Sequence, residues 1–377
     1  MTTTTNNEQK KLNVPNLRFP EFQGEWEKCK LGDYGKVITG NTPPTKDVEN
    51  YENGEYLWAS PADLGTIKSI TETKTMLSAK GFAKTRTLPK GSVLVTCIGS
   101  TIGKTGMATK EMSTNQQINS IVVNDNNDNE FVYYAIQSAF PRYLSSIAVQ
   151  AVPIISKSAF ELLPNKKPCL QEQKRIGKFL SLLDERIATQ NKIIDKLQSL
   201  IKGIAQKIVR NNKTNVRLSE CVECSSSTLQ ESDVCEHGAY PVYGANGIVG
   251  YLDNYNTEGE AVYIIKDGSG VGTVSYVTGN CSATGTLNTL QAKEGYSLQY
   301  LYYLLKVFNF EPYKTGMAIP HIYFKDYGKS KVFCPSYTEQ LRYARLLSAI
   351  DSKLSVEKNL LTSLSMQKQY LLRQMFI

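Results

Sequence analysis

The sequence contains no run of about 18 apolar residues, the length that a helix needs to cross a membrane. Its first residues, Met1 to Lys11, are polar and lack the apolar centre of a signal peptide. We therefore expect a cytoplasmic protein without membrane contact, with residues 1–24 as an N-terminal tail. The eight cysteines are scattered among 377 residues. That is too sparse for a disulfide scaffold and is typical of a compartment where thiols stay reduced.

Histidine is scarce, because His237 and His321 are the two in the chain. A Ser-His-Asp mechanism would have to use one of them, and no G-x-S-x-G turn accompanies either. The stretch Gly103-Lys104-Thr105 matches the end of a phosphate-binding loop, but that motif needs a glycine where Ile98 stands. The sequence therefore favours neither hydrolysis by a catalytic triad nor nucleotide binding.

Two further catalytic patterns are incomplete. Residues 41–44, Asn-Thr-Pro-Pro, differ from the Asn-Pro-Pro-aromatic motif of adenine methyltransferases because Thr42 interrupts it. Asp63, Glu72 and Lys74 have the residue types of a metal-dependent nuclease, in which two carboxylates hold Mg²⁺. The second half of the chain has no equivalent set, so we expect neither methyl transfer nor metal-dependent cleavage at these residues.

The charge is unevenly distributed. The chain has 43 Lys+Arg against 35 Asp+Glu, a net charge of +8. Residues 168–210 hold nine basic and four acidic side chains, residues 335–377 hold six and three, and the remainder holds 28 of each. Any DNA binding outside these two segments must therefore depend on local loops and not on a broad basic surface.

An internal repeat relates these two segments. Residues 168–175, PCLQEQKR, return 167 positions later as PSYTEQLR at residues 335–342, and the match continues without a gap to the C-terminus. Fainter pairs upstream have larger offsets, 169 for Gly99 and Gly268 and 187 for Leu31 and Leu218. The second copy has therefore lost loop residues.

The repeat defines the domain organisation. We predict an α+β protein with a pseudo-twofold internal repeat, in which two α/β-type globular domains are separated by two long helices. The segments are a tail at 1–24, a first domain at 25–167, a central helix at 168–210, a second domain at 211–334 and a C-terminal helix at 335–377.

Both repeated segments have apolar residues spaced by alternating threes and fours, the period of a coiled coil. We call these positions the seam: Ile176, Leu180, Leu183, Ile187, Gln190, Ile194 and Leu197 in the first segment, and Tyr343, Leu347, Ile350, Leu354, Glu357, Leu361 and Leu364 in the second. We predict that the helices pair antiparallel along the seam, with Gln190 close to Glu357. The alternative is that each helix lies separately on its own globular core.

The globular segments carry short motifs in a defined order. The first contains TGNTPP at 39–44, LPKGSVL at 88–94, GSTIGKT at 99–105 and TNQQI at 114–118, and the second contains YPVYGANG at 240–247 and DGSGVGT at 267–273. With the QEQKRI helix that follows, this series resembles the specificity subunit of type I restriction-modification systems.

The resemblance implies a noncatalytic subunit that binds double-stranded DNA. Each globular segment would be a target-recognition domain that reads one half of a bipartite site, and the paired helices would set the gap between the halves. The resemblance also implies two methyltransferase subunits docked on the helices, with restriction or translocase subunits joining them. It implies no cofactor in this chain, because S-adenosylmethionine, ATP and Mg²⁺ would be used by the partner subunits.

Direct readout of DNA needs amide, hydroxyl and basic side chains on loops. In the first domain the candidates are Asn41, Thr42, Lys46, Ser100, Thr101, Lys104, Asn115, Gln116 and Gln117. In the second they are Tyr243, Asn246, Lys266, Ser269 and His321. The amides at 115–117 could equally brace the fold through hydrogen bonds.

A zinc site is one further possibility. Cys221, Cys224, Cys235 and His237 have the residue types of a Cys₃His knuckle, although the first domain has Tyr34 and Val37 at the positions that match the first two. Buried free thiols are the simpler interpretation, and we predict no metal.

Two alternative functions fit the same sequence. The chain could serve a two-subunit system whose partner fuses nuclease and methyltransferase, and the partner's sequence would discriminate this case. It could also be a structural coiled-coil linker whose globular ends bind proteins. Copurification with a methyltransferase and sequence-specific retention of DNA would exclude the linker.

Overall fold

The computed structural model describes residues 13–65, 67–146, 154–316 and 319–377, and the chain divides into two compact units. Unit 1 contains residues 1–189 and 361–377, and unit 2 contains residues 190–360. Residues 1–12 of the predicted tail lie outside the described residues. Among the described residues, none of the helices is long and apolar enough to cross a membrane.

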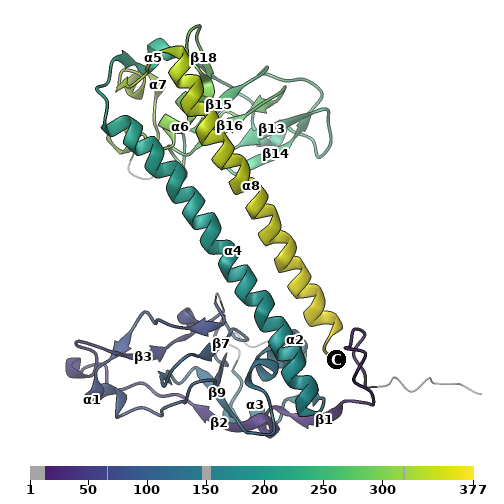
Figure 1. The fold of residues 1–377 in the computed structure, drawn as a ribbon. Coiled ribbons are helices and arrows are strands. Elements are labelled where there is room, and N and C mark those ends of the chain that lie inside the picture. Colours follow the sequence, from purple (N-terminus) through teal and green to yellow (C-terminus); the bar gives the residue numbers. More distant parts are fainter. Residues whose placement is uncertain (1–12, 66, 147–153, 317–318) are drawn as a thin grey trace, which may run out of the picture. The chain divides into compact units, whose positions relative to one another are not determined.

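Unit 1 contains three small sheets (Figure 1). Five strands pair in the order β2-β9-β6-β7-β4, three in the order β5-β3-β8, and two as β1-β10. The strands are β1 (Glu27–Lys30), β2 (Gly35–Thr39), β3 (Tyr56–Ala59), β4 (Ser69–Ile70), β5 (Met76–Leu77), β6 (Val93–Thr96), β7 (Thr105–Ala108), β8 (Ser113–Thr114), β9 (Ile118–Val123) and β10 (Pro164–Lys167). The helices of this domain are α1 (Ala79–Phe82), α2 (Asn129–Ser146) and α3 (Lys157–Glu161).

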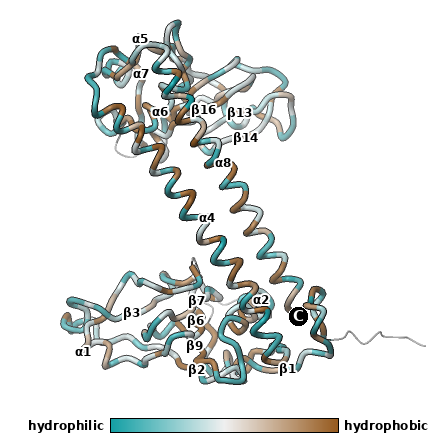
Figure 2. The backbone as a smooth tube through the Cα atoms, viewed as in Figure 1, coloured by the Kyte–Doolittle hydropathy of each residue, from teal (hydrophilic) through white to brown (hydrophobic). Residues whose placement is uncertain are grey.

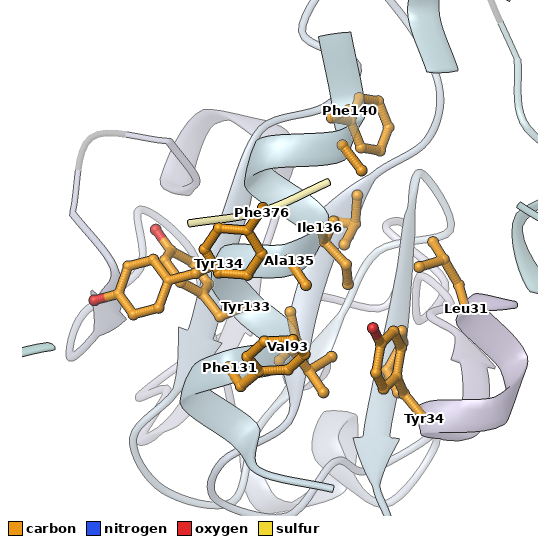
Figure 3. Close-up of a cluster of buried hydrophobic side chains, with 14 of the residues drawn as sticks. Leu31, Tyr34, Val93, Phe131, Tyr133, Tyr134, Ala135, Ile136, Phe140 and Phe376 are labelled. Atoms are coloured by element: carbon orange, nitrogen blue, oxygen red, sulfur yellow. The ribbon is translucent and has the colours of Figure 1, made fainter. Parts of the chain in front are cut away.

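The core of unit 1 combines residues from both ends of the chain (Figure 3). Helix α2 packs against β6 and β7, where Phe131 and Ile136 are fully buried. Phe376, near the C-terminus, joins this cluster, with ring centroids 5.5 Å from Phe131 and 6.1 Å from Trp26. Burial of such aromatic rings removes a large apolar area from water, so the last residues of the chain stabilise the first domain.

Residues 13–24 are also anchored on unit 1. The backbone N–H of Leu17 donates to the carbonyl of Gln374. Arg18 forms an ion pair with the buried Glu172 at 2.7 Å, and the Trp26 indole donates to the same carboxylate. A buried carboxylate needs such partners, since an unpaired charge would be strongly destabilising. The described part of the predicted tail therefore packs on the domain.

Unit 2 repeats the sheet order of unit 1 without one edge strand. Four strands pair as β12-β18-β15-β16, three as β14-β13-β17, and two as β11-β19. The strands are β11 (Val216–Arg217), β12 (Val222–Ser226), β13 (Tyr240–Gly244), β14 (Gly247–Leu252), β15 (Ala261–Ile265), β16 (Val274–Val277), β17 (Ser282–Ala283), β18 (Leu287–Ala292) and β19 (Lys331–Val332). The short helices are α5 (Leu218–Cys221), α6 (Leu298–Leu305) and α7 (Phe324–Tyr327).

The duplication is visible in matched hydrogen bonds. Gly103 N–H donates to Thr96 in unit 1, and Gly272 N–H donates to Ile265 in unit 2, both at 2.9 Å. Gln173 and Gln340 each cap the start of a domain helix, because their side-chain oxygens accept from the N–H groups of Asp128 and Ser297. Their amide groups also donate to the carbonyls of Pro168 and Pro335.

Two long helices run through both units, α4 (Leu170–Arg210) and α8 (Tyr337–Gln374). Figure 2 shows apolar and polar residues alternating along both of them. In unit 1, Ile176 and Leu180 of α4 share a core with Leu371 and Met375 of α8. In unit 2, Gln190 of α4 bonds to Glu357 of α8. Early residues of one helix thus meet late residues of the other, so the helices pair antiparallel, and the α+β class is confirmed.

Candidate nucleic-acid interface

Three of the predicted loops of unit 1 meet at one end of the strands of its main sheet: they follow β2, join β6 to β7 and precede β9. The N–H of Asn41 donates to the carbonyl of Thr114 at 2.9 Å, and the N–H of Cys97 donates to that of Gln117 at 2.8 Å. We call residues 40–46, 99–104 and 114–117 the unit 1 loop cluster. Their backbone is fixed by the strands that they connect, which holds the side chains in defined positions.

Two of the predicted DNA-contacting amides in this cluster brace its backbone. The Asn41 side chain donates to the carbonyl of Lys84 and accepts from the N–H of Arg86, both at 2.9 Å. Asn115 is buried, donates to the Gln117 side chain and accepts from the Gln117 N–H. These amides therefore stabilise turns, which is the alternative that the sequence left open at 115–117.

The other candidates in the unit 1 loop cluster differ in exposure. Lys46, Ser100, Lys104 and Gln116 are exposed, whereas Thr42, Thr101 and Gln117 are half-buried. The Thr42 hydroxyl donates to the side-chain oxygen of Gln116. The stem of Lys104 lies against Gly65, whose φ of +92° is a backbone conformation that favours glycine. The exposed side chains of the unit 1 loop cluster thus present amide, hydroxyl and ammonium groups, the types that bind base edges and phosphates.

In unit 2 the turn at 266–269 matches the turn that follows β6 in unit 1, and the other predicted residues lie on different loops. Lys266 lies at the end of β15, and the N–H of Ile322 donates to its carbonyl at 2.9 Å. Ser269 is exposed in the turn that follows, and Asn246 is exposed in the turn between β13 and β14. Tyr243, on β13, packs on Tyr263, and burial raises the pKa of its hydroxyl. We call residues 243–246, 266–269 and 321 the unit 2 loop cluster.

Asp267 is a residue of this cluster that the sequence interpretation missed. Its carboxylate lies 2.7 Å from Nδ1 of His321, and His321 exchanges backbone hydrogen bonds with Thr315. The pairing orients the imidazole ring, and the exposed Tyr323 follows two residues later. The Asp-Gly-Ser-Gly turn was the available signal for Asp267, but nothing local in the sequence linked it to His321.

Two of the possible catalytic motifs have structural roles. In the glycine-rich turn at 99–104, the N–H groups of Ile102, Gly103 and Lys104 donate to carbonyls of the turn itself or of its flanking strand. They are therefore not directed at a phosphate, as a nucleotide loop would require. Asp63 accepts from the N–H groups of Ser60 and Lys74, so it braces a turn.

The four possible zinc ligands do not form a metal site. Across the described ranges, no group of three or more His, Cys, Asp or Glu side chains could hold a metal ion. Cys221 is buried with its sulfur 3.8 Å from that of Cys334, a neighbour that the sequence did not indicate. Cys224 is half-buried, and desolvation raises its pKa to about 11. Cys235 and His237 are exposed.

The seam residues all lie buried or half-buried on α4 and α8. At the polar layer, the amide nitrogen of Gln190 donates to the Glu357 carbonyl at 3.1 Å and also to its carboxylate. Lys353, one turn earlier on α8, forms an ion pair with the same carboxylate. Hydrogen bonds from Lys353 and Gln190 lower the pKa of Glu357. A polar layer of this kind fixes the register of a coiled coil at some cost in stability.

Replacing both polar residues, Gln190→Leu with Glu357→Leu, is expected to raise the free energy of unfolding by about 1–3 kcal/mol, because apolar packing replaces a buried polar pair. In the wild-type chain, the stabilisation that ionised Glu357 gives the folded state is fully present above its ordinary pKa of 4.5. That stabilisation is lost as the pH falls through the lowered pKa of the folded state. The gain should therefore be larger at acidic pH. Helix melting followed by circular dichroism at pH 7 and pH 4 measures both effects, and an unchanged melting temperature would contradict the prediction.

Comparison with known proteins identifies the duplicated plan. The family model described as "Type I restriction modification DNA specificity domain" matches twice, at residues 23–199 and 211–366. The chain belongs to this type I specificity family. The two matches cover both globular domains and most of both long helices, in agreement with the internal repeat.

Several relatives of the type I specificity family are similar in sequence. The MjaIX specificity subunit of Methanocaldococcus jannaschii is 29% identical over 46% of this chain and 42% of its own length. The HindI specificity subunit of Haemophilus influenzae is 30% identical over 52% and 39%. The chain thus spans about two fifths of the length of these relatives. The EcoprrI specificity subunit of Escherichia coli is 21% identical over 87% and 88%.

Solved structures share the fold. The crystal structure of a type I restriction-modification S subunit from M. genitalium has a TM-score of 0.69 at 20% identity, covering 97% of this chain and 99% of that one. A chain from a study of complex assembly and conformational transition in the type I system has a TM-score of 0.53 at 16% identity, covering 92% and 96%. At these identities the likeness concerns the fold alone.

Proposed function

We propose that this chain is the noncatalytic DNA-specificity subunit of a type I restriction-modification complex. Unit 1 and unit 2 would each read one half of a bipartite, asymmetric DNA site through their loop clusters. The observation that carries the proposal is that the two domains share one backbone frame, in which the bond from Cys97 to Gln117 matches that from Lys266 to Thr286, but their loops display different side chains. A common frame with different amide, hydroxyl and basic groups fits two different half-sites.

The paired helices would set the distance between the two half-sites. The 41 residues of α4 correspond to about 60 Å of helix at 1.5 Å per residue. A coiled coil is stiff along its axis, so its length would determine which gap the two domains can span. The polar layer of Gln190 and Glu357 supports this role, because it opposes slippage of one helix along the other.

The helices would also dock two methyltransferase subunits, which restriction or translocase subunits would join. Exposed apolar side chains on both helices support this part of the proposal: Leu182, Ile193 and Leu200 on α4, and Leu346, Val356 and Met366 on α8. These residues lie outside the seam, so their side chains can make apolar contacts with a docked protein. S-adenosylmethionine, ATP and Mg²⁺ would then be bound by the partners.

Exchange of residues 25–167 for the matching domain of another family member is expected to change one half of the methylated site and leave the other half and the gap unchanged. Exchange of residues 211–334 is the matched control and should change the other half. The measurement is adenine methylome sequencing of cells that express each variant with the methyltransferase subunit. Absence of site-specific methylation with the wild-type chain would contradict the proposal and favour a structural linker. A change in both halves would contradict the assignment of one half to each domain.

A further inference from the structure

Unit 1 holds two lysine ammonium groups in a polar cradle between its domain and the long helices. Lys368 of α8 pairs with Asp184 of α4 at 2.6 Å, and the Tyr134 hydroxyl donates to the other oxygen of Asp184, also at 2.6 Å. Lys68, just before β4, donates to the hydroxyl of Ser181 at 2.8 Å. The two ammonium groups lie 5.6 and 5.5 Å from the centre of the Tyr134 ring. Carboxylate, hydroxyl and aromatic face together are suited to an ammonium group.

Unit 2 retains part of this cradle. In unit 1, Lys68 also forms an ion pair with Glu130 at 2.7 Å. Glu130 stands two positions after the helix cap at Asp128, and the neutral Gln299 stands two positions after the matching cap at Ser297. Ser348 and Asp351 of α8 stand 167 positions after Ser181 and Asp184. A tyrosine hydroxyl again donates to the aspartate, now from Tyr303 to Oδ2 of Asp351 at 3.4 Å. The carboxylate and tyrosine hydroxyl that hold Lys368 in unit 1 are thus repeated in unit 2, whereas the carboxylate partner of Lys68 is not.

Both lysines are missing from the copy in unit 2. At the offset of 167, the counterpart of Lys368 is the buried Ile201. The offset between the copies falls from 187 at Leu31 to 169 at Gly99, so the second copy is shorter by about 18 residues in the stretch that contains Lys68 and β4. In unit 1, β4 pairs with β7 and forms one edge of the main sheet. Among the described strands of unit 2, β16 corresponds to β7 and forms that edge itself, without a strand that corresponds to β4.

A pocket of about 270 Å³ occupies this place in unit 2. We call it the Asp351 pocket; it is lined by Tyr276, Gln299, Tyr302, Tyr303, Ser348, Asp351, Ser352 and Ser355. Among the described residues, no Lys, Arg or His lines it or forms an ion pair with Asp351. The ammonium group of Lys306 lies 5.0 Å from the centre of the ring of Tyr302, which lines the pocket.

We propose that the Asp351 pocket receives a lysine side chain of the methyltransferase subunit, an inference that rests on the proposed function. In unit 1, the matching side chains bind a lysine ammonium group that belongs to this same chain. Two observations favour a partner protein: Asp351 forms no ion pair with any of the residues that the structure describes, and Val356, one turn beyond Ser352 on α8, is exposed. An ammonium group in the pocket would form charge-assisted hydrogen bonds with Asp351 and the serine hydroxyls.

The test uses the full chain and its methyltransferase subunit. Asp351→Asn keeps the size of the side chain but removes its charge, and the expected result is at least tenfold weaker association, measured by isothermal titration calorimetry. Ser355→Lys places an ammonium group one turn from Asp351 on the same helix and should weaken association similarly by filling the pocket. Glu294→Gln, at an exposed carboxylate of unit 2, is the matched control and should bind as the wild type does. The melting temperature of each variant checks the fold.

Carbodiimide cross-linking identifies the lysine directly. The reagent joins a carboxylate to an amine with loss of water, so the wild-type complex should yield a peptide linking Asp351 to a lysine of the methyltransferase subunit. Asp351→Asn should not yield it. A link to a lysine of this same chain, or an unchanged dissociation constant for both pocket variants, would overturn the inference and leave the proposed function intact. If the wild-type chain does not bind the methyltransferase subunit at all, the proposed function fails instead.

Discussion

Insertion of one heptad after Gln190 in α4 and another beside Glu357 in α8 is expected to lengthen the gap of the DNA site and leave both half-sites unchanged. Seven residues preserve the 3.5-residue period of the seam and add about 10 Å of helix. Duplex DNA rises about 3.4 Å per base pair, so the selected gap should grow by about three base pairs. Methylation at the original spacing should fall at least 100-fold.

The measurement is methylome sequencing of cells that carry the lengthened chain and the methyltransferase subunit. A heptad inserted in α4 alone is the control. It displaces Gln190 from Glu357 and shifts every later pair of the seam, so helix pairing and methylation should both be lost. If the symmetric insertion changed the half-site sequences, or left the gap as it was, the spacing role of the helices would be wrong.

Phe376→Ala is expected to lower the free energy of unfolding of unit 1 by about 3 kcal/mol, although residue 376 follows the second domain in the sequence. Its ring is buried against Trp26 and Phe131, and truncation would leave a cavity in that core. Both tryptophans of the chain, Trp26 and Trp58, lie in unit 1, so urea denaturation followed by tryptophan fluorescence reports on this unit.

Met366→Ala is the control for this prediction. Met366 lies in the same unit, on α8, but its side chain is 65% exposed, so its truncation should change stability by less than about 0.5 kcal/mol. Equal stability of Phe376→Ala and the wild type would show that the C-terminus does not contribute to the core of the first domain.

The long helices and the duplication could be predicted from the sequence because they depend on local spacing. Apolar residues at alternating threes and fours specify a helix with one apolar stripe, whatever the rest of the chain does. The repeat then placed Gln190 and Glu357 at equivalent positions, and a pseudo-twofold axis brings equivalent positions of antiparallel helices together. The hydrogen bond between these two residues follows from that symmetry.

The candidate site was predictable in its loops but not in the role of each side chain. Asn41 and Asn115 have the residue type of a DNA contact, yet both amides are used by neighbouring backbone groups. Which amide is free depends on strand pairing between segments far apart in the chain, such as the bond from Asn41 to Thr114. The pairing of His321 with Asp267 has the same origin, because the two lie 54 positions apart.

The sequence by itself determined that no run of about 18 apolar residues is present, that the catalytic patterns considered are incomplete, and that the chain carries two related domains with two long amphipathic helices. Those properties follow from composition and from the spacing of residues that are close together in the sequence. Only the tertiary structure decided that the C-terminus completes the first core, that the Asn41 and Asn115 amides form hydrogen bonds within the domain, and that, among the described residues, no lysine pairs with Asp351 as Lys368 pairs with Asp184. These depend on contacts between distant segments, whose geometry is set by packing and strand register.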